Sequence, residues 1–115
     1  MEAMWTSCLP TILKAKELIE QGVLGEVISI RADFGFKPPV DLDGRLYNKS
    51  LGGGALLDIG IYPVFLALTM LGYPEKITAI GKLGQTGVDE EIGIILEHEA
   101  GTMSHLHSTI LTKTT

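Results

Sequence analysis

Hydrophobic and polar positions alternate most regularly between residues 26 and 36, in the stretch EVISIRADFGF. Apolar side chains take every second position, and Ser29, Arg31 and Asp33 stand between them. This spacing predicts a strand with one buried face and one polar face, which is typical of an antiparallel sheet that is open to water on one side.

Further strands are expected near both ends of the chain. Their ranges are residues 2 to 5, 76 to 83, 91 to 98 and 102 to 112. Residues 99 to 101 predict a tight hairpin turn between the last two of these strands.

Helical spacing begins at residue 9 and ends at residue 21, where Ile12, Ala15 and Ile19 recur on one face. Either Thr6 or Ser7 is expected to cap this helix, and Gly22 supplies the glycine that commonly ends one.

A second helix is expected from the glycines at residues 52 to 54 as far as Leu71. Residues 37 to 51, which precede it, predict a long loop, and loops of this length are often functional. The order of elements predicts an α+β fold, with an open-faced, mainly antiparallel or mixed sheet and two helices on one of its faces.

Composition narrows the possible functions. The 115 residues fit one domain, and a net charge of -5 without any long basic run argues against a nucleic-acid partner. The most apolar stretch, residues 55 to 71, contains Asp58, Gly60 and Pro63, which disfavours a membrane-spanning helix. A single cysteine, Cys8, allows no internal disulfide and fits a cytoplasmic location, where it is expected to pack against its neighbours.

The stretch GGGALLDIGIYP, residues 52 to 63, holds the main candidate chemistry. Asp58 and Tyr62 are four residues apart and therefore share a helix face, while Pro63 predicts a bend beside them. A carboxylate and a phenol on a rigid helix end are a reasonable catalytic pair. The same two residues are also typical of helix capping and of core packing. The glycines do not form a dinucleotide-binding turn, because residue 57 is leucine where a third glycine is required.

Weaker candidates lie elsewhere. Arg45, in the long loop, could hold a substrate hydroxyl or carboxylate, or could simply be solvated, and Tyr47 is a similar but weaker candidate. His105 and His107 share one face of a predicted strand. No cysteine joins them and no second carboxylate is clearly placed, so a polar sheet face is expected there rather than a metal site.

The motif GGGALLDIGIYP, together with EAMW and LPTILKAKELIEQGVLGEV near the start, closely resembles the glucose-fructose oxidoreductase, inositol dehydrogenase and MocA family. The branch with tyrosine in this motif, which includes dihydrodiol and D-xylose dehydrogenases, is the most similar. The resemblance covers essentially the whole chain. It implies that residues 1 to 115 are part of the C-terminal substrate and dimerisation domain of a two-domain oxidoreductase, and that an N-terminal Rossmann domain, which this sequence lacks, binds NAD or NADP.

The resemblance also implies roles for single residues. Tyr62 matches the group that exchanges a proton with a secondary alcohol or carbonyl of a sugar, polyol or trans-dihydrodiol, and Asp58 matches its polar neighbour. Trp5 is an apolar wall for the substrate or a core residue. Where the family commonly has Arg-Phe, this sequence has Ser7 and Cys8, which puts contacts made by that segment in question.

Two expectations concern partners. A homodimer through the open sheet face is implied, because that face often packs against a second subunit in the family. The isolated chain is expected to be inactive and to bind no dinucleotide of its own. The alternative is a non-catalytic sheet module that serves self-association or sugar binding.

Overall fold

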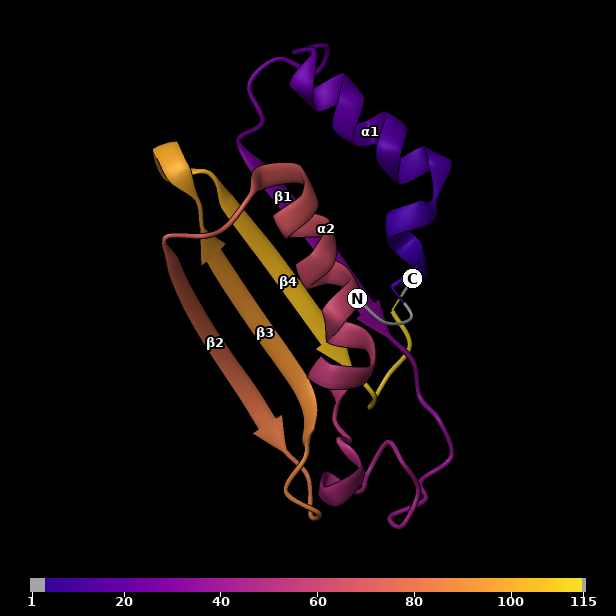
Figure 1. Cartoon of the computed structure of the whole chain (residues 1–115). Helices are drawn as coiled ribbons and strands as arrows, with labels where there is room; N and C mark the ends of the chain where they lie inside the picture. Colours follow the sequence, from indigo (N-terminus) through magenta and orange to yellow (C-terminus); the bar gives the residue numbers. More distant parts are fainter. Residues whose placement is uncertain (1–3, 115) are drawn as a thin grey trace.

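The computed structural model describes residues 4–114, which form a four-stranded mixed sheet in the order β1-β4-β3-β2. The strands are β1 (Ser29–Gly35), β2 (Lys76–Leu83), β3 (Asp89–Glu97) and β4 (Met103–Thr109). Strand β3 lies antiparallel to both β2 and β4, whereas β1 runs parallel to β4. The predicted α+β fold with a mainly antiparallel sheet is confirmed (Figure 1).

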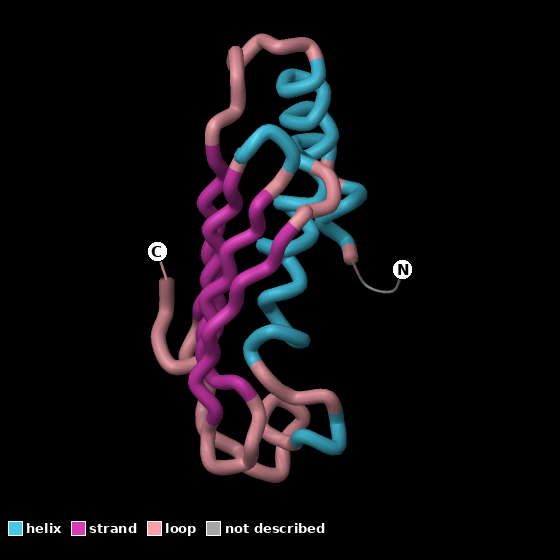
Figure 2. Tube along the Cα trace, turned by 90° about the vertical axis from the view of Figure 1, so that its left-hand side faces the viewer, coloured by secondary structure: helices cyan, strands magenta, loops and turns pink. Residues whose placement is uncertain are grey.

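Two helices, α1 (Pro10–Glu20) and α2 (Ile61–Leu71), lie on the same side of the sheet and leave the other face open (Figure 2). Helix α2 packs directly on the strands, where buried Ala67 meets Leu96 of β3 and Leu106 of β4. By length and composition alone, Lys49–Leu71 could cross a membrane. A core helix has the same composition, and here the stretch covers the sheet.

The start of α1 differs from the expectation. Proline 10 stands in its first turn, where a missing N–H costs nothing, but Leu9 precedes it and no side chain caps it. The proposed caps are therefore wrong, because Ser7 donates its hydroxyl to the carbonyl of Met4, 2.7 Å away. That bond belongs to a 3₁₀ turn at Trp5–Cys8, where part of a strand was expected; the first two residues of that strand lie outside the described range.

Alternation along β1 sets its two faces. Ala32 packs against the cluster beneath α2, whereas Arg31 pairs in register with His105 on the open face. The strand is shorter than predicted, and Ile28, expected on its buried face, is exposed. The hairpin between β3 and β4 is confirmed, since Ala100 and Gly101 both have positive φ there, as a tight turn requires.

Candidate functional site

The three glycines let the long loop approach the start of the second helix closely. The backbone N–H of Gly53 donates to the carbonyl of Asn48 at 3.0 Å, and that of Gly54 donates to Leu46 at 2.8 Å. A side chain on Gly53 would meet the carbonyl oxygen of Leu46 at 2.5 Å, so no larger residue fits without movement. The loop is thereby fixed against the helix.

Asp89 on β3 completes this junction. Its Oδ2 accepts a hydrogen bond from the backbone N–H of Leu56 at 2.7 Å, which satisfies one of the donors that a helix start leaves free. The sheet, the loop and the helix therefore meet at one point.

The helix does not begin as one regular element. A π-helical turn at Leu56–Gly60 precedes the α-helical residues of α2, where a single bent helix was expected. Proline 63 follows this turn and has no N–H to offer the carbonyl of Ile59, which weakens the regular helical bonding there. Such turns are frequent at functional sites, and this one carries Asp58.

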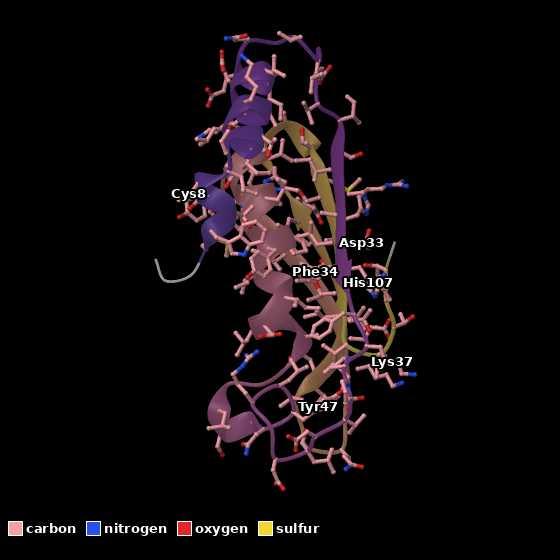
Figure 3. All side chains as sticks on the ribbon, turned by 90° about the vertical axis from the view of Figure 1, so that its right-hand side faces the viewer. Cys8, Asp33, Phe34, Lys37, Tyr47 and His107 are labelled. Carbon is pink, nitrogen blue, oxygen red and sulfur yellow. The ribbon has the colours of Figure 1, made fainter. Side chains whose placement is uncertain are left out.

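Asp58 and Tyr62 open into the same cavity, which has a volume of about 450 Å³, within the range of small-molecule sites. The cavity lies between β1, α2 and the N-terminal turn, and Phe34 points from β1 toward α2 in Figure 3. Its lining is largely aromatic and consists of Trp5, Phe34, Phe36, Asp58, Ile59 and Tyr62.

The ring of Tyr62 lies beside two other aromatic rings. The centroid of Phe34 lies 5.7 Å from that of Tyr62, and the centroid of Trp5 lies 6.1 Å away, both in tilted arrangements that favour aromatic attraction. The hydroxyl of Tyr62 accepts a hydrogen bond from Nε1 of Trp5 at 3.3 Å. The phenol therefore has a side-chain partner and lines a cavity instead of being sealed against main chain.

Arg45 reaches the site from the long loop. Its Nη2 lies 2.6 Å from Oδ1 of Asp58, whose side chain is 17% exposed while that of Arg45 is 65% exposed. The guanidinium neutralises a carboxylate that faces an apolar cavity, and it fixes one oxygen of that carboxylate.

The structure thus brings all four candidate residues together: three line the cavity, and Arg45 is bound to one of these three. Their roles stay predictions. The sequence-based interpretation did not identify Phe34 or Phe36 as part of this site. Their alternation with polar residues predicts a buried strand face, although Phe34 is 39% exposed. Two aromatics directly before a long loop were the available signal.

Tyr47 belongs to the core and not to the cavity. It is 4% exposed and packs with Ala55 and Ile59 under the helix start. Burial, and to a lesser extent the negative charge of Glu90, raises the pKa of its phenol above the ordinary value of 10.0.

None of the three histidines lines this cavity. On the open face, His107 contacts Glu91 at 3.1 Å, while His98 is buried and bonded to Ser104. Within residues 4–114, no group of three metal-binding side chains comes together. Cys8 is exposed, so the expected packing role is wrong, because the 3₁₀ turn directs its side chain outward.

Comparison with known proteins gives consistent results. A family model described as the GFO/IDH/MocA C-terminal domain matches residues 12–115. The trans-1,2-dihydrobenzene-1,2-diol dehydrogenase of Xenopus laevis is 45% identical over 113 residues, covering 96% of this chain and 34% of that protein. The human protein of the same name is 38% identical over 100 residues, covering 85% of this chain and 29% of that protein.

Solved structures give the same grouping. An aldose-aldose oxidoreductase from Caulobacter crescentus, complexed with glycerol, aligns with a TM-score of 0.87 at 25% identity, over 96% of this chain and 35% of that one. KijD10, a 3-ketoreductase from Actinomadura kijaniata in complex with NADP and TDP-benzene, aligns at 0.78 with 28% identity, over 92% of this chain and 33% of that one. The chain spans about a third of the length of these proteins, and it belongs to the GFO/IDH/MocA C-terminal domain family.

Proposed function

We propose that this chain is the substrate domain of a two-domain NAD(P)-dependent oxidoreductase, acting on a secondary alcohol or carbonyl of a trans-dihydrodiol, sugar or polyol. One observation carries the proposal: the Tyr62 phenol and the Asp58 carboxylate open into one aromatic-lined cavity. Relatives that are 37 to 45% identical, the trans-1,2-dihydrobenzene-1,2-diol dehydrogenases of Mus musculus and Xenopus laevis among them, support the reaction class.

Tyr62 is the acid/base in this proposal. Reduction of a carbonyl places negative charge on its oxygen, and that oxygen needs a proton as the charge develops. The hydroxyl of Tyr62 lies at the cavity wall and gives this proton; in the reverse direction its oxygen takes the proton back from the alcohol. A nicotinamide bound in the parent protein supplies or accepts the hydride.

Asp58 and Arg45 hold the substrate end in place. The carboxylate of Asp58 can accept a hydrogen bond from a neighbouring hydroxyl of a diol or sugar through the oxygen that Arg45 leaves free. The residues that line the cavity fit substrate binding and proton transfer. The dinucleotide itself is assigned to a Rossmann domain outside this chain.

Among the candidate substrates, the residues that line the cavity favour a cyclic molecule with an apolar face. Four of the six lining residues are aromatic, and the polar side-chain groups come from Asp58, Tyr62 and the indole N–H of Trp5. A cyclic dihydrodiol presents such a flat face with two hydroxyls at one edge. An open-chain polyol would leave most of its hydroxyls without partners, which costs binding free energy.

The test is the Tyr62→Phe variant in the complete protein that carries this chain. Because only a hydroxyl is removed, the substrate should still bind while turnover of a trans-dihydrodiol with NADP falls by about 10² to 10⁴-fold, as expected for loss of a general acid. Tyr73→Phe is the matched control, since Tyr73 is 89% exposed and lies outside the cavity. Unchanged turnover in Tyr62→Phe would contradict the proposal.

The proposal includes a homodimer formed through the open face of the sheet. Ile80 is 80% exposed there, and charged pairs such as Lys76 with Glu97, 3.0 Å apart, stand at its edge. A face that carries both exposed apolar and charged side chains is compatible with a protein interface.

A further inference from the structure

The hydroxyl of Tyr62 has one hydrogen-bond partner among residues 4–114, the indole Nε1–H of Trp5 at 3.3 Å. These two residues are far apart in the sequence, and the contact joins the N-terminal turn to α2. The two rings form an apolar wall, and this hydrogen bond is the polar contact between them.

The direction of this hydrogen bond is fixed by chemistry. An indole N–H can only donate, so it occupies a lone pair of the Tyr62 oxygen. The proton of the phenol then cannot point at Trp5 and is left for another acceptor.

The second ring beside Tyr62 cannot do this. Phe34 lies 5.7 Å from Tyr62 between centroids and carries no hydrogen-bonding group. Both neighbours of Tyr62 therefore make apolar contacts with its ring, but only Trp5 donates a hydrogen bond. Phe34 is thus a matched comparison for Trp5.

Local bonds hold Trp5 where it can donate. It opens the 3₁₀ turn at Trp5–Cys8, in which both the hydroxyl and the backbone N–H of Ser7 donate to the carbonyl of Met4, at 2.7 and 3.1 Å. A turn fixed in this way orients a side chain that is itself 60% exposed and lightly packed.

We infer that Trp5 is a positioning residue for the acid/base: its indole N–H occupies one lone pair of the Tyr62 hydroxyl and leaves the phenolic proton directed to the substrate oxygen. This inference rests on the proposed function for the role of Tyr62. In this role Trp5 acts through its N–H group, whereas an apolar wall would act only through the shape of its ring.

The first test uses the complete protein. Trp5→Phe keeps an aromatic wall but removes the donor, so kcat should fall about tenfold while KM stays within about twofold, as for the loss of one hydrogen bond used in the reaction. Phe34→Leu should give the opposite division, with KM raised and kcat less affected. A Trp5→Phe enzyme with raised KM and unchanged kcat would show a wall only and would overturn the inference.

The second test needs neither cofactor nor turnover. In the NMR spectrum of the complete protein, the indole N–H signal of Trp5 is the one that is lost in Trp5→Phe. In Tyr62→Phe that signal should shift and its proton should exchange faster with water. An unchanged position and exchange rate would mean that the hydrogen bond does not form in solution, and would overturn the inference.

The two proposals can fail separately. If Tyr62→Phe keeps full activity, the proposed function is wrong and Trp5 has no proton to orient. If Tyr62→Phe is inactive while Trp5→Phe turns over at the parent rate, only the inference about Trp5 is wrong. Thermal melting of both variants should match that of the parent protein within a few degrees, because both removed groups lie at an open cavity.

Discussion

The guanidinium of Arg45 lies 2.6 Å from the carboxylate of Asp58, so the loop before the glycines is tied to the helical turn after them. Asp58 is mostly shielded, whereas Arg45 is mostly in water. An ion pair of this kind adds little to stability, because water screens the charge of the exposed partner. Its main effect is on the direction in which the carboxylate points.

Arg45→Gln should therefore change activity more than stability. The free energy of unfolding should fall by no more than about 1 kcal/mol, while kcat/KM of the complete protein falls about tenfold as Asp58 loses its fixed orientation. Arg45→Lys should recover part of the loss. Denaturant unfolding and steady-state kinetics on the same preparations measure both, and a large stability loss with normal kinetics would contradict this division.

The glycine-rich junction gives a prediction about packing. Gly53→Ala would push a methyl group against the carbonyl of Leu46, whereas Gly52→Ala meets nothing within 4 Å and suffers only from its φ of +72°. The cost of the positive φ alone is about 1–2 kcal/mol. Gly53→Ala should be the more destabilising of the two in urea unfolding, and equal losses would mean that the loop does not press on the helix start.

Asp89 supplies a third comparison at the same junction. Asp89→Ala removes the acceptor for the backbone N–H of Leu56 and should cost about 1–2 kcal/mol, as for loss of a helix cap. Asp89→Asn retains a carbonyl oxygen at that place and should keep most of the stability. Chemical denaturation of the two variants provides the measurement, and similar losses in both would indicate that charge, not the hydrogen bond, is what matters.

How far the sequence predicts this structure depends on how local each feature is. Strand β2 was predicted with its observed bounds, because its flanking turn residues are clear. The parallel pairing of β1 with β4 could not be predicted, since it depends on contacts between distant parts of the chain. The 3₁₀ turn at Trp5–Cys8 was also missed, because it follows from one side-chain bond made by Ser7.

The site shows the same limit. The four-residue spacing of Asp58 and Tyr62 predicts that they share a direction, and both line one cavity. Alternation by itself does not separate Phe34 from core residues, because it gives the face of a strand and not what lies opposite that face. Arg45 contacts Asp58 only because the loop folds back onto the helix start, and the spacing of residues in the sequence does not predict such a contact.

Alkaline pH should destabilise the protein through Tyr47. Because the pKa of its phenol is raised in the folded state, the unfolded chain releases that proton first. The contribution to stability is complete below the ordinary tyrosine pKa of about 10 and is lost as pH rises through the higher folded value. Tyr47→Phe should therefore lose less stability than the parent as the pH rises above about 10. Tyr73→Phe, at an exposed site, should follow the parent curve in urea titrations at each pH.

The open face of the sheet yields the last prediction. Ile80 and Ile95 stand on that face beside Thr78 and His105, around a shallow hollow of about 360 Å³. If a second copy covers this face, Ile80→Asp buries a charge without a partner and should weaken the dimer by at least about tenfold. Val23→Asp is the control, because Val23 is similarly exposed but lies in the turn after α1. Sedimentation equilibrium over a range of concentrations measures both variants, and a parent protein that stays monomeric throughout would contradict the homodimer.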